Sequence, residues 1–141
     1  MSQEPKPIGL EGLPTLLKLT FAFVDSLALK CVIELGIADI IRSQGHPVSL
    51  SEIASHLKFP YLDLTFLSCS MQLLVRGEIF MMVNPDSDKP NETLYWLTPA
   101  SRLILQHDEA CTSYAPMVLM HTHPNLLTPW HYLCHSIKEG G

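Results

Sequence analysis

Residues 13–35 constrain the fold more than any other segment, because they predict a long helix that is apolar on nearly every side. One apolar stripe recurs at helical spacing and should face the chain's own core. It consists of Leu13, Leu16, Leu17, Thr20, Val24, Leu27, Ala28, Cys31 and Leu35. A second stripe on another side of the same helix consists of Leu19, Ala22, Phe23, Ser26, Leu29 and Ile33.

A helix that is apolar nearly all round must be buried nearly all round. A chain of 141 residues has the size of one domain, and it can cover one face of such a helix but hardly two. The second stripe therefore predicts a partner, either another subunit or another domain. One wide core face is the alternative interpretation.

Glycine and capping residues divide the next part of the chain into short helices. Gly36 is a natural C-terminal cap for the first helix, and a short helix is expected over residues 37–42. Ser49 and Glu52 have the spacing of a capping box, in which each side chain satisfies a free backbone N–H of the first helical turn. They predict a helix over residues 50–57.

A longer helix and a β-hairpin follow. The apolar spacing predicts a helix over residues 61–76, with Gly77 as its cap. Residues 78–83 and 93–98 predict two strands on either side of a turn-rich loop, and Pro99 begins another helix.

Two more helices are expected, one over residues 111–120 and one from Pro124 or Pro129 to about Lys138. The order of elements predicts a mainly α fold, a winged helix-turn-helix with one β-hairpin wing and additional C-terminal helices. The expected organisation is a flexible N-terminus over residues 1–12, a winged-helix domain over 13–110 and C-terminal helices over 111–141.

Winged helices often bind DNA, but the charge pattern argues against that function here. A DNA-reading helix needs Arg, Lys, Asn or Gln on its surface. In the helix over residues 61–76 the only charged residues are Asp63 and Arg76, and the only amide is Gln72. The wing loop is acidic, the net charge is -5, and the basic residues are scattered along the chain. We expect no nucleic-acid binding, because like charges repel a phosphate backbone.

Composition also bears on the compartment. The N-terminus lacks the charged and then apolar pattern of a signal peptide, and the apolar runs are too short to span a membrane. The cysteines are dispersed in apolar surroundings and predict buried free thiols in a reducing compartment, the cytoplasm. They are Cys31, Cys69, Cys111 and Cys134.

The C-terminal segment MHTHPNLLTPWHYLCHSIKEGG resembles a cluster of metal ligands, with His121, His123, His131, Cys134 and His135 close together. Helical spacing, however, places an apolar face on this segment, which predicts packing and a Trp130 that anchors the last helix in the core. That face consists of Trp130, Leu133, Cys134 and Ile137. We therefore expect no metal site, with His131 and His135 on a half-exposed flank.

Several stretches in the same order resemble plant S-adenosylmethionine-dependent small-molecule O-methyltransferases. They cover roughly residues 13–141, and their sequences are most similar to those of enzymes that methylate benzylisoquinoline alkaloids, isoflavonoids and related phenols. The stretches are LALKCVIELGIADII, VSLSEIASHL, QLLVRGEIF, LYWLTPASRLIL and PNLLTPWHYL.

The resemblance implies that this region is a dimerisation domain whose first helix interlocks with a partner, in a homodimer or in a heterodimer with a related O-methyltransferase. It also implies that Phe21 and Phe23 reach toward the partner's pocket. Together with the second stripe, this gives an expected dimer interface of Leu19, Phe21, Phe23, Leu29 and Ile33.

The resemblance further implies that Met120, His121, Leu126 and Leu127 line the pocket for a small phenolic substrate. His121 has two possible interpretations. It contacts the substrate, by stacking or by a hydrogen bond, or it has a purely structural role.

The family's cofactor, S-adenosylmethionine, binds a Gly-rich loop in a catalytic domain. This chain contains no G-x-G and nothing similar to that loop. We therefore expect neither cofactor-binding nor catalytic residues in it, and no methyl transfer by this chain alone. The expected function is the N-terminal dimerisation and substrate-pocket portion of such an enzyme. A complete but truncated paralogue that dimerises with full-length relatives is the alternative, and a DNA-binding regulator is a weaker one.

Overall fold

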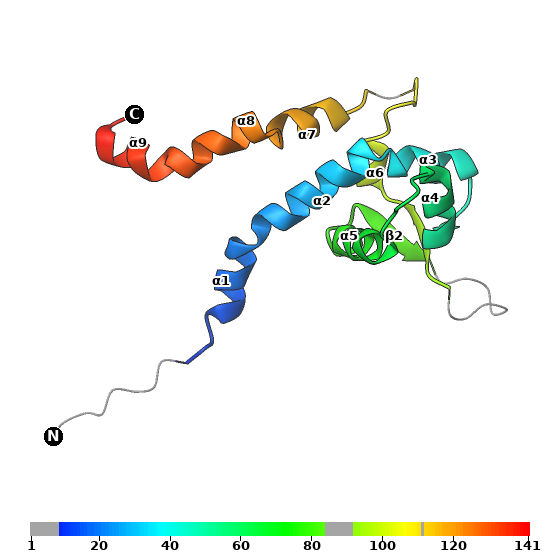
Figure 1. The fold of residues 1–141 in the computed structure, drawn as a ribbon, viewed down its shortest axis with the longest axis horizontal. Coiled ribbons are helices and arrows are strands. Elements are labelled where there is room, and N and C mark those ends of the chain that lie inside the picture. The colour runs from blue at the N-terminus through cyan, green and yellow to red at the C-terminus, as the bar shows by residue number, and fades with distance from the viewer. Residues whose placement is uncertain (1–8, 84–91, 111) are drawn as a thin grey trace.

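The computed structural model describes residues 9–83, 92–110 and 112–141. It shows a body of short helices around a small sheet, and two helical arms that extend from this body on the same side (Figure 1). The N-terminal arm is α1 (Leu13–Thr20), and the C-terminal arm is the run of short helices from Pro124 to Glu139.

The expected helix over residues 13–35 is broken into α1 and α2 (Ala22–Glu34). The break lies at Phe21, whose backbone leaves helical geometry with φ -104° and ψ 12°. Just before it, the Thr20 hydroxyl donates to the Leu16 carbonyl at 2.8 Å, a contact that commonly bends helices. The prediction of one continuous helix was therefore wrong, and α1 points away from the body.

Local signals place α3 and α4 correctly. Gly36 adopts φ 67°, the left-handed conformation that glycine tolerates best, and α3 (Ile37–Gln44) begins after it. The capping box before α4 (Leu50–Leu57) is confirmed. The Ser49 N–H donates to Glu52 Oε2 at 2.7 Å, and the Glu52 N–H donates to Ser49 Oγ at 3.2 Å.

Helix α5 (Leu64–Arg76) begins three residues later than predicted, because Asp63 caps it by accepting the Phe66 N–H at 3.0 Å. It ends in a Schellman motif, in which the Glu78 N–H donates to the Val75 carbonyl and the Ile79 N–H to the Leu74 carbonyl. Gly77 is the C-cap, as predicted, but the left-handed position of the motif is the next residue, Glu78, with φ 61°.

The predicted hairpin is confirmed as β2 (Phe80–Val83) and β3 (Leu94–Leu97), which pair antiparallel. A short strand that the sequence did not predict, β1 (Val48–Ser49), pairs with the other edge of β3, so the sheet has the order β1-β3-β2. Most of the predicted acidic wing loop, residues 84–91, lies outside the described residues.

The core of the body lies between the sheet, α3, α4, α5 and the C-terminal half of α2. Its largest fully buried apolar side chains are Phe80, Ile37, Ile41, Ile53, Met71, Val32 and Val48. Two polar clamps tie the segment after the sheet to this core. The Thr98 hydroxyl bonds the Glu78 and Ile79 carbonyls, and the Asp39 carboxylate accepts the backbone N–H groups of Gln106 and His107. Thr98 also caps the short helix α6 (Pro99–Arg102).

The C-terminal region consists of shorter pieces than predicted. Helix α7 (Ala115–His121) packs along α2. It is followed by α8 (Pro124–Leu127), the 3₁₀ helix η1 (Thr128–Tyr132) and α9 (Leu133–Glu139). Prolines near the start of α7, α8 and η1 divide the segment, because proline cannot donate a helical hydrogen bond. The predicted mainly helical fold with a hairpin wing and extra C-terminal helices is confirmed.

Candidate functional site: an apolar face and a helical joint

The first candidate surface is the exposed apolar face of α1 and α2. None of the α1 residues is buried, and three of the expected interface residues are more than half exposed: Leu19 at 74%, Phe21 at 55% and Phe23 at 58%. A helix end this apolar is unusual on a solvent-facing surface unless another surface covers it.

The structure corrects the assignment of the two stripes. Ile33 is 2% exposed and lies in the chain's own core, because its side of α2 is covered within the chain. It therefore presents no side chain to a partner, and Leu29 is also partly buried against this core. Conversely, Leu27 and Cys31 belong to the stripe that was predicted to face the core, yet both are exposed.

The N-terminal part of that same stripe shows the largest departure from prediction. Leu13, Leu16 and Leu17 are exposed at 40%, 60% and 44%, because the bend at Phe21 carries α1 away from the body. The stripe predicted to fill the core thus reaches it only at its C-terminal end.

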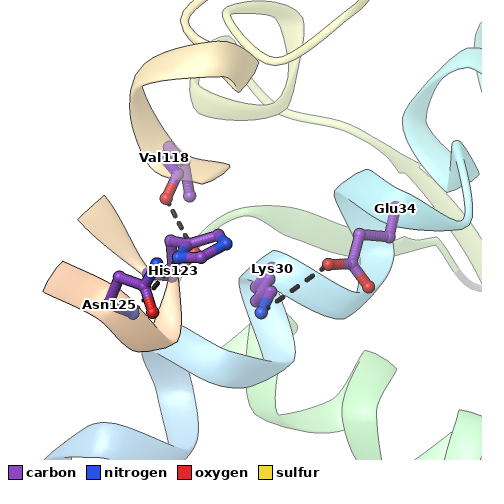
Figure 2. A network of polar contacts seen from close by, with 6 residues as sticks. Lys30, Glu34, Val118, His123 and Asn125 are labelled. Carbon is purple, nitrogen blue, oxygen red and sulfur yellow. Dashed lines mark hydrogen bonds and ion pairs between the residues drawn. The ribbon is translucent and has the colours of Figure 1, made fainter. Parts of the chain in front are cut away.

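The second candidate surface is the joint between α7 and α8, where α7 passes beside α2 (Figure 2). At this joint the Thr122 hydroxyl donates to the Val118 carbonyl at 2.7 Å, and the Asn125 N–H donates to His123 Nδ1 at 3.1 Å. Opposite it, Lys30 of α2 pairs with Glu34 at 3.8 Å. His123 therefore caps α8, which gives this histidine a structural role.

The four expected pocket residues flank this joint. Met120 and His121 are at the end of α7, whereas Leu126 and Leu127 are in α8. All four are exposed, with Met120 at 53%, Leu126 at 44% and Leu127 at 36%. The described residues leave this surface open to solvent, so an enclosed pocket here would need walls from another domain or subunit.

The C-terminal arm does not pack as predicted. Every residue from His123 to Gly141 is exposed, including Trp130 at 69% and Ile137 at 75%. Trp130 is therefore not an anchor in the core of this chain. His131 in η1 and His135 in α9 are exposed too. Within the described ranges, no three His, Cys, Asp or Glu side chains are grouped to hold a metal ion.

The prediction of buried cysteines is wrong for the three described ones, Cys31, Cys69 and Cys134, which are free and exposed. Apolar neighbours in sequence do not bury a residue that lies on the outer flank of its helix. Cys31 still lies against other side chains. Partial burial, and secondly the nearby Glu34 carboxylate, raise the pKa of the Cys31 thiol, which therefore stays protonated at neutral pH.

Sequence reasoning missed an apolar groove of about 480 Å³ between α2, α5 and the loop that joins α4 to α5. Its rim is aromatic and exposed, with Phe59 at 57%, Tyr61 at 96% and Phe66 at 75%. The signal for it was the stretch FPYLDLTF, in which three aromatic residues occur close to a helix start without the spacing of a core-facing stripe.

A family model described as the O-methyltransferase dimerisation domain matches residues 17–107. The chain therefore belongs to the O-methyltransferase dimerisation domain family, and the resemblance to plant O-methyltransferases is confirmed. Among the residues that the structure describes, no helix combines the length and the apolar character needed to cross a bilayer.

Two plant enzymes illustrate the relationship. The chain is 44% identical over 130 residues to desmethylxanthohumol 6'-O-methyltransferase of Humulus lupulus, covering 89% of this chain and 36% of the relative. It is 42% identical over 136 residues to (R,S)-reticuline 7-O-methyltransferase of Papaver somniferum, covering 92% of this chain and 37% of the relative. The chain thus spans little more than a third of these relatives.

Solved structures share the fold. Human N-acetylserotonin methyltransferase in complex with SAM superimposes with a TM-score of 0.74 at 16% identity, over 97% of this chain and 37% of that one. The pyocyanin biosynthetic protein PhzM superimposes with a TM-score of 0.67 at 26% identity, over 94% of this chain and 35% of that one.

Proposed function

We propose that the chain is the dimerisation and substrate-pocket portion of an O-methyltransferase that transfers a methyl group from S-adenosylmethionine to a phenolic hydroxyl of a plant secondary metabolite. The observation that carries this proposal is the family match over residues 17–107, together with identities of 44% and 42% to plant O-methyltransferases. The cofactor and the base that deprotonates the phenol would belong to a catalytic domain, since this chain contains no Gly-rich cofactor loop.

Dimer formation is the first part of the proposed role. Leu19, Phe21 and Phe23 supply exposed aromatic and aliphatic side chains of the kind that carry protein interfaces. The partner would be a second copy or a related O-methyltransferase. Covering α1 would also stabilise it, since a helix of eight residues is marginal on its own.

Positioning of the substrate is the second part. Met120 and Leu126 present apolar side chains from two helices that meet at the α7–α8 joint, and His121 adds a ring that can stack or form a hydrogen bond. These residues would hold the phenol ring in line with the methyl donor, and correct orientation accounts for much of the rate of such a reaction.

Two measurements test this proposal on the protein as its gene encodes it. The coding sequence past Gly141 should contain a Gly-rich cofactor motif, and an immediate stop codon would instead support the truncated, non-catalytic paralogue. The full protein should then methylate phenols with S-adenosylmethionine.

In that protein, His121→Ala should raise KM for the preferred phenol about fivefold, the value of one lost hydrogen bond or stacking contact. His131→Ala is the matched control, because His131 is an exposed histidine of the C-terminal arm and lies outside the proposed pocket. An unchanged kcat/KM across a panel of phenols for His121→Ala would remove His121 from the substrate site.

A further inference from the structure

The apolar groove between α2, α5 and the α4–α5 loop has walls from three parts of the body. Cys31, Val32 and Leu35 form its α2 wall, while Phe66 and Leu67 are on α5. The loop contributes Phe59, Pro60 and Tyr61 at the open edge. Because the rim side chains are mostly exposed, the groove is open to a side chain that approaches from outside.

The groove continues the exposed face of α2. Phe23, Leu27 and Cys31 are spaced by four residues and therefore follow one another along one side of the helix. Phe23 is 58% exposed and Leu27 is 39% exposed. Cys31 is both the last member of this row and a wall of the groove, so the row leads directly into it.

The family match favours a second copy of the chain as the molecule that covers this continuous surface. The row on α2 and the whole groove lie inside residues 17–107, the segment that matches the dimerisation domain. Since a dimer of like chains is formed by the same surface on both, its interface must be self-complementary about a two-fold axis. The row and the groove can satisfy this requirement, because they adjoin at Cys31 and each copy carries both. The row of one copy can then pack into the groove of the other.

We infer that the groove receives Phe23 of a second copy of the chain, with the two α2 helices packed antiparallel around a two-fold axis at Leu27. Phe23 and Cys31 lie four residues on either side of Leu27, about 6 Å along the helix axis. The two-fold axis therefore brings Phe23 of each copy to the Cys31 and Phe66 wall of the other. This inference rests on the proposed dimer and assigns its contacts. It places Phe23 in the partner's groove and not in the partner's substrate pocket, toward which the family resemblance directed it.

The arrangement makes the same contact twice in each dimer. Replacing Phe23 with Lys or Phe66 with Asp therefore damages two aromatic contacts at once. Both residues are more than half exposed in the single chain, so the variants should fold. We expect each variant alone to dimerise on the order of 100-fold more weakly than the unchanged chain, as measured by sedimentation.

Mixing the two variants tests the pairing itself. A dimer of one F23K chain and one F66D chain brings the introduced lysine against the introduced aspartate at one contact and keeps the native Phe23–Phe66 contact at the other. Each homodimer instead contains two mismatched contacts. Sedimentation of the equimolar mixture should therefore recover a heterodimer. Leu103→Asp, at a 50% exposed position outside the groove and the row, is the control and should leave the dimer unchanged.

A second measurement uses the native cysteines. Alkylation of Cys31, followed by mass spectrometry, should be suppressed at micromolar protein and restored on dilution. Cys134 on the C-terminal arm, outside both surfaces, should react equally at both concentrations.

The outcomes separate this inference from the proposed dimer. A wild-type chain that stays monomeric contradicts the dimer itself. A wild-type dimer that F66D leaves intact, or in which Cys31 stays as reactive as in the monomer, shows that the groove lies outside the dimer interface and overturns the inference. Failure of the F23K and F66D mixture to form a heterodimer overturns the assigned pairing.

Discussion

Helices α1 and α4 are both eight residues long and rich in leucine, yet their surroundings differ in almost every respect. Helix α4 has a capping box, and its Ile53 is 0% exposed in the core. Helix α1 lacks a side-chain cap, buries none of its residues and leaves Leu16 60% exposed. Apolar spacing thus predicts that a face will be covered, but it does not predict which molecule covers it.

The body and the C-terminal arm show the same contrast between buried and exposed apolar side chains. Trp130 and Leu133 are as apolar as core residues, but they are 69% and 50% exposed on short helices that contact mainly one another. The body is folded by its own contacts. In the proposed enzyme, a second subunit or a further domain would cover both arms.

The largest expected difference is between the stability lost on truncating a residue of the body and a residue of the N-terminal arm. Phe80 is 1% exposed, so Phe80→Ala should lower the free energy of unfolding by about 3–5 kcal/mol, through lost burial and the cavity it leaves. Leu16→Ala should change it by less than about 0.5 kcal/mol in dilute protein. Urea unfolding followed by circular dichroism measures both, and a comparable loss for Leu16→Ala would mean that α1 packs on the body.

The next effect concerns the helix cap that α4 has and α1 lacks. Ser49→Ala removes the side-chain acceptor for the Glu52 N–H and should lower the free energy of unfolding by about 1 kcal/mol. Ser51→Ala, at an exposed site in the first turn of the same helix, is the control and should be neutral or slightly stabilising. Equal losses for the two variants would show that the capping box contributes no stability.

A similar or smaller effect is expected at Gly36 and Glu78, two of the left-handed positions of the body. Gly36→Ala should destabilise by about 1 kcal/mol, because φ 67° is strained for a residue with a Cβ atom. Glu78 already bears this strain at φ 61°, so Glu78→Gly should stabilise by about 0.5–1 kcal/mol. Thermal unfolding of the pair should therefore show midpoints that shift in opposite directions, and shifts of the same sign would contradict this explanation.

The smallest expected effect is a decrease in the stability of the body at alkaline pH. Burial raises the pKa of Tyr95 above its ordinary value of 10.0, because the phenolate is poorly solvated in the core. The folded state therefore keeps the proton longer than the unfolded state, so stability is fully present below pH 10 and declines as pH rises beyond it. Tyr95→Phe should flatten this decline in urea titrations between pH 9 and 11, and an unchanged slope would assign it to other groups.

Local chemistry explains which parts of the fold could be predicted. The capping box at Ser49 and Glu52, the left-handed Gly36 and the two strands of the hairpin depend on residues close in sequence, and each was predicted at or near its observed place. Strand β1 was not predicted, because two residues carry too little pattern to indicate a pairing with Tyr95.

The parts that depend on tertiary packing could not be predicted. On α2, Leu27 and Ile33 are both strongly apolar, and the placement of the elements packed on α2, among them α3, α5 and α7, decides that the first is exposed and the second is buried. The groove joins Cys31 to Phe66 across two helices, so no single sequence window contains it. The α7–α8 joint, which carries Met120 and His121, is also a property of the assembled chain.

Sedimentation equilibrium of the chain, from nanomolar to micromolar concentration, is the most direct test of whether a second subunit covers α1 and α2. If it does, the micromolar mass should approach twice the 15.8 kDa of one chain and should fall on dilution. A mass of 15.8 kDa at every concentration would contradict the dimer and leave the exposed face of α1 and α2 unexplained.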